Sequence, residues 1–467
     1  MRRGLSRLGS VVLSIGVFLA AGAAGAADDA RVGELEKQAH ELQRQLDALR
    51  GQGANAATVA ELERQIQVLA AEVEKLKLGE AAPEDGAGRY GLGPSASKVY
   101  SLKKGVTFGG YGEMLYSSPS SSLEDGSPSG QASQIDFLRA VLYFGAKLTD
   151  KILFNSEIEF EHVTTGEGAE ERGEVTVEFA YLDFLVNEGV NVRAGLLLVP
   201  MGFINERHEP PTYVGTRRPL VEQAIIPTTW SEDGVGLFGD IGSRVTYRAY
   251  ITSGLAAAEG TSSGAEGFFA EGIRDGRSKG GQASAEKLAI TGRIDGTPID
   301  GLTIGASFFT GDAGQNLPFP GGRLKAWTTV ADGHAEYRWR GLTARALYAH
   351  ISIDDADDVN AAQGLAGAAS VGESQYGWYG EVGYDVLTHV NGARQALIPY
   401  TRYERLNTQD AVPAGFLADP ANDVKKLTAG AMWKPIPNVA VKLDWNQIQN
   451  GARTGFDEVN ASLGFMF

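Results

Sequence analysis

Few side chains in this sequence have the types and spacing that catalysis or metal binding requires. The chain contains no cysteine, which excludes disulfides, thiolate metal ligands and a thiol nucleophile. Its histidines form no H-x-H or H-E-x-x-H spacing. His208 lies near Glu206 and Glu209, a pattern compatible with weak metal or proton binding but more typical of a solvated loop. We therefore expect no catalytic residue, no metal site and no cofactor, and so no enzyme.

Charge and hydropathy narrow the class of protein further. The formal net charge is −16, which argues against a general nucleic-acid binder. The only apolar run that approaches membrane length, residues 11–20, follows three arginines and precedes a tail of small residues ending in Ala24-Gly25-Ala26. Residues 1–26 are therefore predicted to be a secretory signal peptide that is cleaved after Ala26, so that the mature chain is exported.

Residues 27–78 predict a short coiled coil in two segments. Apolar heptad series begin at Val32 and Leu35, and they restart at Val59 and Leu62 after Gly51-Gln52-Gly53 has broken the register. Such short amphipathic helices need partners, so we expect self-association, although the pattern leaves the number of chains open. Residues 79–104 are rich in Gly, Ala, Ser and Pro and are expected to form a linker.

From residue 105 to residue 467 the hydropathy pattern has a period of two, which predicts β-strands. Residues 439–446, for example, alternate between apolar and mostly polar side chains. We identify sixteen such segments, which begin near residues 106, 136, 152, 174, 191, 234, 244, 286, 302, 326, 342, 372, 396, 424, 439 and 457.

The connections between these segments alternate in length. Those after even-numbered segments are short, and those after odd-numbered segments are generally longer, as in 199–233, 255–285 and 354–371. Short periplasmic turns and long outer loops are typical of a transmembrane barrel. Residues 105–467 are therefore predicted to form an all-β fold, a sixteen-stranded antiparallel transmembrane β-barrel preceded by the coiled coil.

The second face of the predicted strands is expected to line a water-filled lumen. Inward-facing basic and acidic residues are both frequent, so the charges alone do not decide between anions and cations. Alternatively, Arg–Glu pairs across neighbouring strands only brace the wall. The excess of carboxylates in the outer loops fits contact with divalent ions and lipopolysaccharide. The inward-facing basic residues that would contact a solute are Arg139, Arg193, Arg248, Arg293, Arg345, Arg402 and Lys442.

Residues 199–233 contain the most specific signals. The segment begins with Val199-Pro200-Met201-Gly202, contains five prolines and ends near Trp230-Ser231-Glu232-Asp233-Gly234. Loops of this length are usually functional. With the opening Gly109-Gly110-Tyr111-Gly112-Glu113 and the terminal Phe467, these motifs make residues 105–467 resemble the phosphate-selective porin O and P family, in which a coiled coil is a common accessory.

The resemblance implies a homo-oligomeric, trimeric porin in the outer membrane of a Gram-negative bacterium, with the coiled coil in the periplasm. It implies that the third outer loop folds into the lumen as a constriction, where Arg207, Arg217 and Arg218 supply positive charge. It also implies passive diffusion of small anionic solutes such as phosphate.

A structural role is the alternative function. The coiled coil would then contact the cell wall and tether the outer membrane to it, while the barrel would serve as an anchor with little or no transport. A plugged lumen favours this tether, whereas open conductance steps in a lipid bilayer favour a porin.

Overall fold

The computed structural model describes residues 37–38, 41–42, 44, 88–102, 104–162, 173–390 and 395–467. Residue contacts divide the chain into two compact units, Met1–Ala81 and Ala82–Phe467. In the first unit the described residues are helical, and Arg44 forms an ion pair with Glu41 at 2.7 Å. The predicted signal peptide and the rest of the predicted coiled coil lie outside the described residues.

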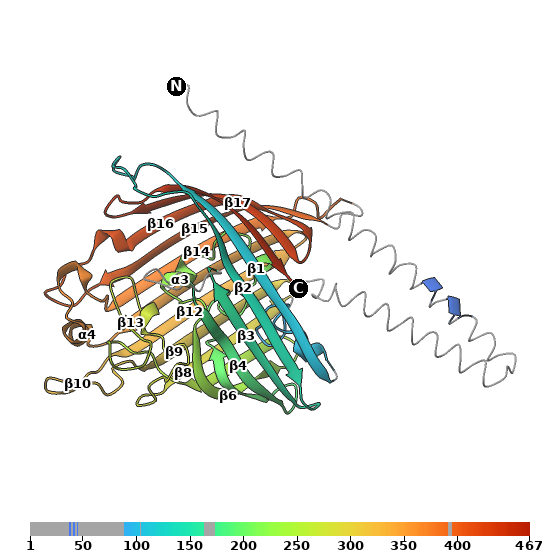
Figure 1. Cartoon of the computed structure of the whole chain (residues 1–467), viewed down its shortest axis with the longest axis horizontal. Helices are drawn as coiled ribbons and strands as arrows, with labels where there is room; N and C mark the ends of the chain where they lie inside the picture. Colours follow the sequence, from blue (N-terminus) through green and yellow to red (C-terminus); the bar gives the residue numbers. More distant parts are fainter. Residues whose placement is uncertain are drawn as a thin grey trace, which may run out of the picture. The chain divides into compact units, whose positions relative to one another are not determined.

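The second unit is built on a closed antiparallel barrel (Figure 1). Strands that are consecutive around the wall pair with each other, and the barrel closes where β1 pairs with β18. Its sixteen strands are β1 (Gly105–Pro119), β2 (Gln134–Lys147), β3 (Ile152–Glu161), β4 (Val175–Leu185), β5 (Asn191–Leu198), β6 (Ser231–Ile241), β7 (Val245–Thr252), β8 (Ala289–Ile299), β9 (Leu302–Asp312), β12 (Trp327–Trp339), β13 (Leu342–Ile353), β14 (Ser374–Tyr384), β15 (Ala396–Ala411), β16 (Asp423–Ile436), β17 (Val439–Asn450) and β18 (Asp457–Met466).

The remaining elements are short and lie in the connections. Two very short strands form a separate hairpin, and one four-residue α-helix lies between β5 and β6. These elements are η2 (Lys98–Ser101), η3 (Pro210–Thr212), α3 (Val221–Ala224), η4 (Arg274–Gly276), β10 (Pro318–Phe319), β11 (Gly322–Arg323), α4 (Ala356–Gln363), η5 (Gly367–Ala369) and η6 (Pro420–Asn422). None of the helices among the described residues combines the length and the apolar character needed to cross a membrane.

The sixteen-stranded barrel predicted from the period-two pattern is confirmed. Every predicted segment corresponds to one strand, and each strand begins within three residues of the predicted position. Connections at one end of the barrel are mostly short, as at 242–244 and 340–341, and we call this the short-turn end. The other end carries the longer connections, including 199–230 and 253–288, and we call it the long-loop end.

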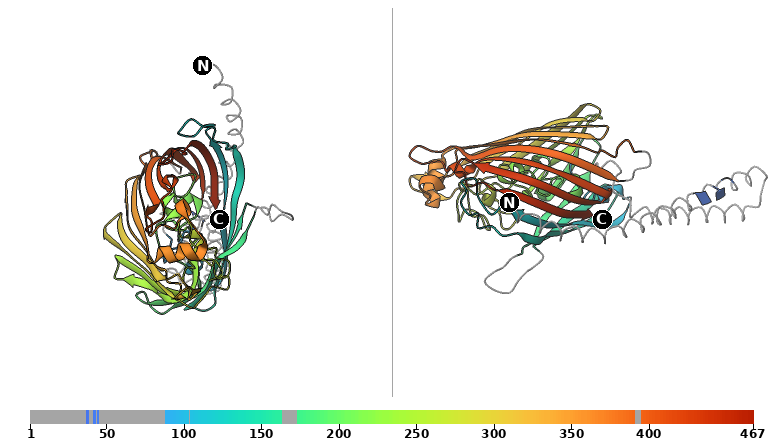
Figure 2. Two further views of the ribbon diagram at one scale, coloured as in Figure 1. Left: turned by 90° about the vertical axis from the view of Figure 1, so that its left-hand side faces the viewer. Right: turned by 90° about the horizontal axis from the view of Figure 1, so that it is seen from above.

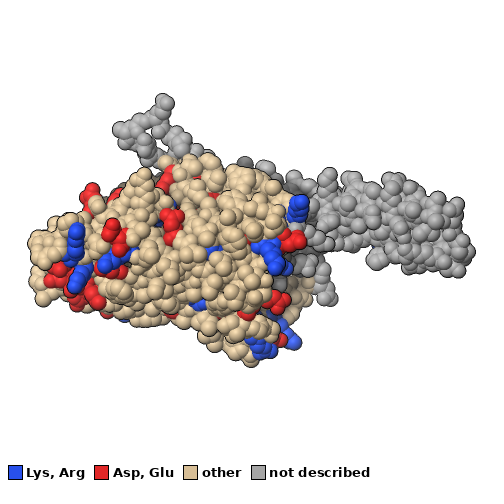
Figure 3. Space-filling view, turned by 90° about the horizontal axis from the view of Figure 1, so that it is seen from below, with Lys and Arg blue, Asp and Glu red and all other residues tan. Residues whose placement is uncertain are grey.

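The outer face of the barrel is apolar. Trp327 and Trp339, at opposite ends of β12, are 51% and 55% exposed, and many aliphatic side chains between the rims are also exposed. Figure 3 shows a broad band of mostly uncharged residues, with charged residues gathered toward the two ends. A continuous apolar band of this kind is stable when it faces lipid, so the barrel is built to span a membrane.

The main apolar core lies inside the barrel, where we had expected water. It joins Met201 and Trp230 in the connection 199–230 to Phe268 in the connection 253–288 and to the wall residue Phe309. Seen from the long-loop end, loops and α4 cross the barrel (Figure 2, left). The inward face of the strands is therefore largely covered by protein.

Residues 88–102, expected to be part of a linker, also fold inside the barrel. Leu92, Val99 and Tyr100 are buried against inward-facing aromatic residues that include Tyr143 and Phe179. Complete burial of one aliphatic side chain contributes about 1.5–3 kcal/mol, which offsets the entropy lost when the segment becomes ordered. We call residues 88–102 the N-terminal plug.

Deletion of residues 28–87 is expected to leave the barrel folded, because residues 82–467 form a compact unit whose strands satisfy their backbone hydrogen bonds within the barrel. The measurement is heat-modifiable mobility on gels after folding into lipid. Deletion of residues 28–102 should also give a folded barrel but a lower melting temperature, since it removes the buried side chains of the plug. Loss of the folded band in the shorter deletion would contradict the prediction.

Candidate solute path inside the barrel

The connection 199–230, which we call the inward loop, is closed at its base by one asparagine. The Nδ2 atom of Asn205 donates hydrogen bonds to the carbonyl oxygens of Val199 (2.7 Å) and Trp230 (3.0 Å). The Oδ1 atom of Asn205 accepts a hydrogen bond from the backbone N–H of Trp230 (2.7 Å). Because Asn205 is fully buried, this base fixes the direction in which the loop leaves the wall.

Carboxylates on distant strands then hold the loop inside the barrel. Asp444 on β17 accepts a hydrogen bond from the backbone N–H of Thr216 (2.8 Å), and Glu404 on β15 accepts one from Leu220 (2.5 Å). These strands lie far around the wall from β5 and β6, which the loop connects. The loop therefore crosses the interior, in the place where the sequence predicted a constriction.

Each of the six predicted pore-lining arginines of the wall forms an ion pair. Four of them are buried, and the side chains of Arg293 and Arg345 are 8% and 11% exposed. The pairs are Arg139 with Glu113 and Glu159 (3.5 Å to each), Arg193 with Asp183 (2.8 Å), Arg248 with Glu206 (2.9 Å), Arg293 with Asp295 (2.7 Å), Arg345 with Glu336, and Arg402 with Glu381 and Glu404 (3.1 Å to each).

Several of these pairs follow directly from strand register. Arg345 on β13 lies opposite Glu381 on β14, and Glu381 lies opposite Arg402 on β15. Opposite charges in such cross-strand positions attract each other. Lys442 differs, because its Nζ donates to the Gly215 carbonyl (2.8 Å) and lies 3.8 Å from the centre of the Tyr213 ring. The wall cations are thus occupied by wall carboxylates or by the inward loop.

The arginines of the inward loop lack such compensation. Among the described residues, no carboxylate lies within 4.0 Å of the side chain of Arg207, Arg217 or Arg218. Arg218 is only 7% exposed, and its Nε and Nη2 atoms have no hydrogen-bond partner. Burial, followed by the nearby Arg293 guanidinium, lowers the pKa of Arg207 to about 10, so Arg207 remains charged at neutral pH. The loop therefore supplies guanidinium groups that form no direct ion pair with a described carboxylate, although Glu159 acts on Arg218 and Glu336 acts on Arg207 at longer range.

Two further arginines, which the sequence analysis did not single out, extend this charge. Arg277 Nη1 donates to the carbonyl oxygens of Thr228 (2.9 Å) and Thr229 (3.1 Å), and burial lowers its pKa to about 10. The pKa of Arg274 is lowered by burial and then by the charge of Arg218. Both residues belong to the long connection 253–288, and that length was the one sequence signal that could have pointed to them.

The packed interior also contains buried polar atoms without a protein partner. Within the described residues they include the hydroxyl oxygens of Tyr111 and Ser462 and one carboxylate oxygen of Glu157. Buried polar groups in proteins are nearly always bonded to protein or to water. The hydrogen-bonding capacity of these atoms is therefore not used by described protein groups.

A cavity of about 330 Å³ lies at the short-turn end, and we call it the vestibule. Arg207 and Phe203 of the inward loop line it together with wall residues and turn residues 242–246. Among its charged groups, Arg248 and Arg293 form ion pairs, whereas Arg207 and Arg244 form none with the residues that the structure describes. Four guanidinium groups and three carboxylates line the vestibule: Arg207, Arg244, Arg248, Arg293, Asp240, Asp295 and Glu336.

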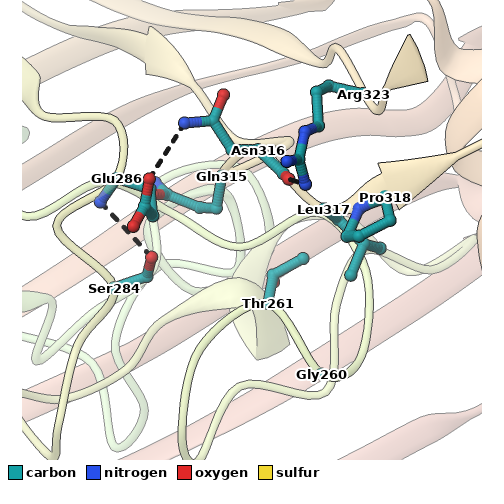
Figure 4. A pocket seen from close by; sticks show the side chains of 9 residues that line it. All are labelled: Gly260, Thr261, Ser284, Glu286, Gln315, Asn316, Leu317, Pro318 and Arg323. Carbon is teal, nitrogen blue, oxygen red and sulfur yellow. Dashed lines mark hydrogen bonds between the residues drawn. The ribbon is translucent and has the colours of Figure 1, made fainter.

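A second cavity, of about 430 Å³, lies among the long loops (Figure 4). Gln315 joins the loops around it, because its amide donates to the carbonyl oxygens of Leu255 and Lys287 and accepts from the backbone N–H of Lys287. Glu286 accepts a hydrogen bond from Asn316 at 3.0 Å. The lining side chains include one carboxylate and one guanidinium, so their formal charges cancel. This cavity is therefore not the charged part of the solute path.

His208 is buried, although the sequence pattern was more typical of a solvated loop. Its Nε2 lies 2.9 Å from Glu157 Oε1, and its Nδ1 lies 3.0 Å from the carbonyl oxygen of Asn205. Within the described ranges, no group of three or more His, Cys, Asp or Glu side chains is arranged to hold a metal ion. His208 thus fixes the inward loop to β3.

Structural comparison finds outer-membrane barrels with low sequence identity. OmpF of Salmonella typhi, in a complex with daunomycin, aligns with a TM-score of 0.49 and 12% identity over 78% of this chain and 98% of that chain. The outer-membrane channel DcaP of Acinetobacter baumannii gives 0.48 and 9% over 78% and 97%, and an anion-selective porin from Comamonas acidovorans gives 0.47 and 11% over 78% and 99%. We transfer no substrate from these proteins.

Sequence comparison places the chain more firmly. No protein-family model matches it, so the resemblance to phosphate-selective porins stays a prediction. An uncharacterized protein of Aquifex aeolicus (strain VF5) is 38% identical over 403 residues, which cover 84% of this chain and 87% of that protein. The chain therefore belongs to the same family as the Aquifex aeolicus protein.

Proposed function

We propose that this protein is an outer-membrane channel of a Gram-negative bacterium that allows passive diffusion of small anionic solutes, phosphate among them. The membrane barrel supplies the passage, and the inward loop supplies the selectivity. No covalent chemistry is required, since the concentration gradient drives the solute and the charge pattern selects it.

The observation that carries the proposal is that the described arginines of the inward loop form no direct ion pair. A buried guanidinium without a counterion is costly unless an anion or water satisfies it. Arg218 has two nitrogens without a hydrogen-bond partner and forms no direct ion pair with a described residue, although Glu159 acts on it at longer range. Arg207 presents a second guanidinium without a direct ion pair in the vestibule. A small anion passing between these two positions would be attracted at both.

The burial of the wall charges favours the tether as a second candidate function. If the interior stayed as closely packed as it is here, the barrel would anchor the protein without conducting. Conductance separates the two functions, because an anchor gives no ion current in a planar lipid bilayer and a channel gives discrete steps.

The test of the channel is a double substitution, Arg207→Gln with Arg218→Gln. It removes two positive charges from the path, so the reversal potential across a salt gradient should shift toward cation preference. Arg405→Gln is the matched control, since Arg405 is partly exposed and pairs with Asp423 at 3.4 Å. A measurable current with the same reversal potential in both variants would show that the loop arginines do not contact the solute.

The proposed partners follow from the same architecture. The apolar outer band would contact outer-membrane lipid, and carboxylates in the long loops would bind lipopolysaccharide through divalent ions. We also propose that the protein is a homotrimer, with the coiled coil in the periplasm and available for contact with the cell wall. Cross-linking in native membranes would test the number of chains.

A further inference from the structure

The N-terminal plug is bonded to both the inward loop and the barrel wall. Glu209 Oε1 on the loop accepts hydrogen bonds from the backbone N–H groups of Ser95 (2.9 Å) and Ala96 (3.0 Å). On the wall side, Asn155 Nδ2 donates to the Ala96 carbonyl (2.9 Å). The hydroxyl of Ser95 donates to the carbonyl of Phe467 (2.6 Å). The middle of the plug is therefore held between two surfaces.

An ion pair of the wall holds the end of the plug. The Tyr100 hydroxyl donates to Asp183 Oδ2 (2.6 Å) and accepts from Arg193 Nη2 (2.8 Å). All three side chains are buried. Arg193, which the sequence placed in a water-filled lumen, is thus one of the groups that hold the plug.

Glycines allow the plug to approach the loop closely. A Cβ atom at Gly93 would lie 2.6 Å from the Glu209 carboxyl carbon. Gly91 has a φ of +89°, and its carbonyl accepts a hydrogen bond from Arg207 Nε (3.3 Å). The plug therefore contacts an arginine that lines the vestibule, on the proposed path of the solute.

We propose that the N-terminal plug is an autoinhibitory segment that closes the solute path at the short-turn end, and that Glu209 is the latch that joins it to the inward loop. This inference rests on the proposed channel function. Release of the plug would uncover the aromatic wall and the vestibule together, and loss of the two hydrogen bonds to Glu209 would favour that release.

The latch should also respond to pH. Glu209 faces Glu157 on β3, Tyr143 on β2, Lys98 in the plug and its own neighbour His208. Burial raises the pKa of Glu209 to about 7 from an ordinary value of 4.5. If release hydrates the carboxyl group, the closed state binds more protons than the open state between these two values. Closure is then favoured near pH 5, and opening is favoured as the pH rises to 8.

A reversible cross-link offers a direct test. A Cβ atom at Gly109 on β1 would lie 2.8 Å from Ser95 Oγ, which brings cysteines at the two positions within reach of a disulfide. The natural chain has no cysteine, so Ser95→Cys with Gly109→Cys forms the one possible bond within a chain. Single-cysteine variants control for the substitutions, and heat-modifiable mobility confirms folding.

The experiment compares single-channel records of the wild type, Glu209→Ala and the cysteine pair combined with Glu209→Ala. We expect Glu209→Ala to raise the open probability roughly tenfold, because the loss of two hydrogen bonds typically changes an equilibrium constant by about this factor. Oxidation of the cysteine pair should lower the open probability to the wild-type value. Reduction of the disulfide should raise it again to the value of Glu209→Ala. Glu188→Ala, a change at an exposed residue of the short-turn end, should have no effect.

Two further variants extend the test. Tyr100→Phe keeps the ring but loses the hydroxyl, and it should also raise the open probability. It takes the place of Glu209→Ala in the test if that variant fails to fold. Glu209→Gln should abolish the rise in open probability between pH 5 and pH 8, whereas a pH response caused by His208 would survive it.

Two results would overturn the proposal. Equal, measurable conductance in the wild type and Glu209→Ala, unaffected by oxidation of the cysteine pair, would leave the channel intact but show that the plug does not gate it. Absence of current in every folded variant, including the deletion of residues 28–102, would remove the channel function and the autoinhibition together.

Discussion

Excision of residues 206–228, with a short Gly linker in their place, is expected to raise single-channel conductance several-fold and to weaken ion selectivity. The excision removes the apolar residues Val221, Ile225 and Ile226, which are fully buried inside the barrel. It also removes the three arginines of the loop, which form no direct ion pair with a described residue. Asn205 and Trp230, which close the base of the loop, are retained, so that β5 and β6 keep their connection.

Because the excision also removes Glu209, it would release the plug as well. Glu209→Ala serves as the control, since it releases the plug and leaves the loop in place. If the excision raises conductance beyond that of Glu209→Ala, the loop itself narrows the path. If the two variants conduct equally, the loop lies outside the permeation path and the constriction assignment is wrong.

Replacement of Arg402 by methionine is expected to lower the free energy of unfolding by roughly 3–5 kcal/mol, which is the usual cost of breaking a buried ion pair. The Arg402 side chain is 1% exposed and lies between Glu381 and Glu404, at 3.1 Å from each. Methionine fills much of the same volume, so the loss would come from two carboxylates left buried without a counterion. Urea unfolding in lipid vesicles would measure the change.

Arg405→Met on the same strand is the control for this prediction. Its ion pair with Asp423 is more than a third exposed on the arginine side, and exposed pairs contribute at most about 1 kcal/mol. Similar losses of unfolding free energy in the two variants would show that the charged side chains on the inner wall are hydrated rather than buried. The comparison thus also tests how dry the interior of the barrel is.

The strands were predictable because alternate side chains face lipid and the interior of the barrel, and these two environments favour apolar and polar residues, respectively. Each side chain of β12, for example, faces either lipid or the interior, so the hydropathy of a residue indicates which way its side chain points. Connection lengths then indicated the barrel, and the length and prolines of residues 199–233 indicated a special loop. These signals are local in the sequence. They can be recognised without knowing which distant residues each segment contacts.

The interior could not be predicted in the same way, since its contacts join residues distant in sequence. The pairing of Arg193 with Asp183 depends on register, and that of Arg248 with Glu206 depends on where the inward loop folds. The plug was mistaken for a linker because Gly, Ala and Ser are typical of flexible chain. Here the same small residues permit close packing, as at Gly93 beside Glu209.

Because the plug contacts Phe467, its binding inside the barrel depends in part on the pairing of β1 with β18 during folding. Phe467 exchanges two backbone hydrogen bonds with Gly110 at the seam between β1 and β18, and its carbonyl also accepts from Ser95. Until that seam closes, one anchor of the plug does not exist. A barrel whose seam is still open would therefore hold the plug by one bond fewer, and closure of the seam would complete the site that binds the plug.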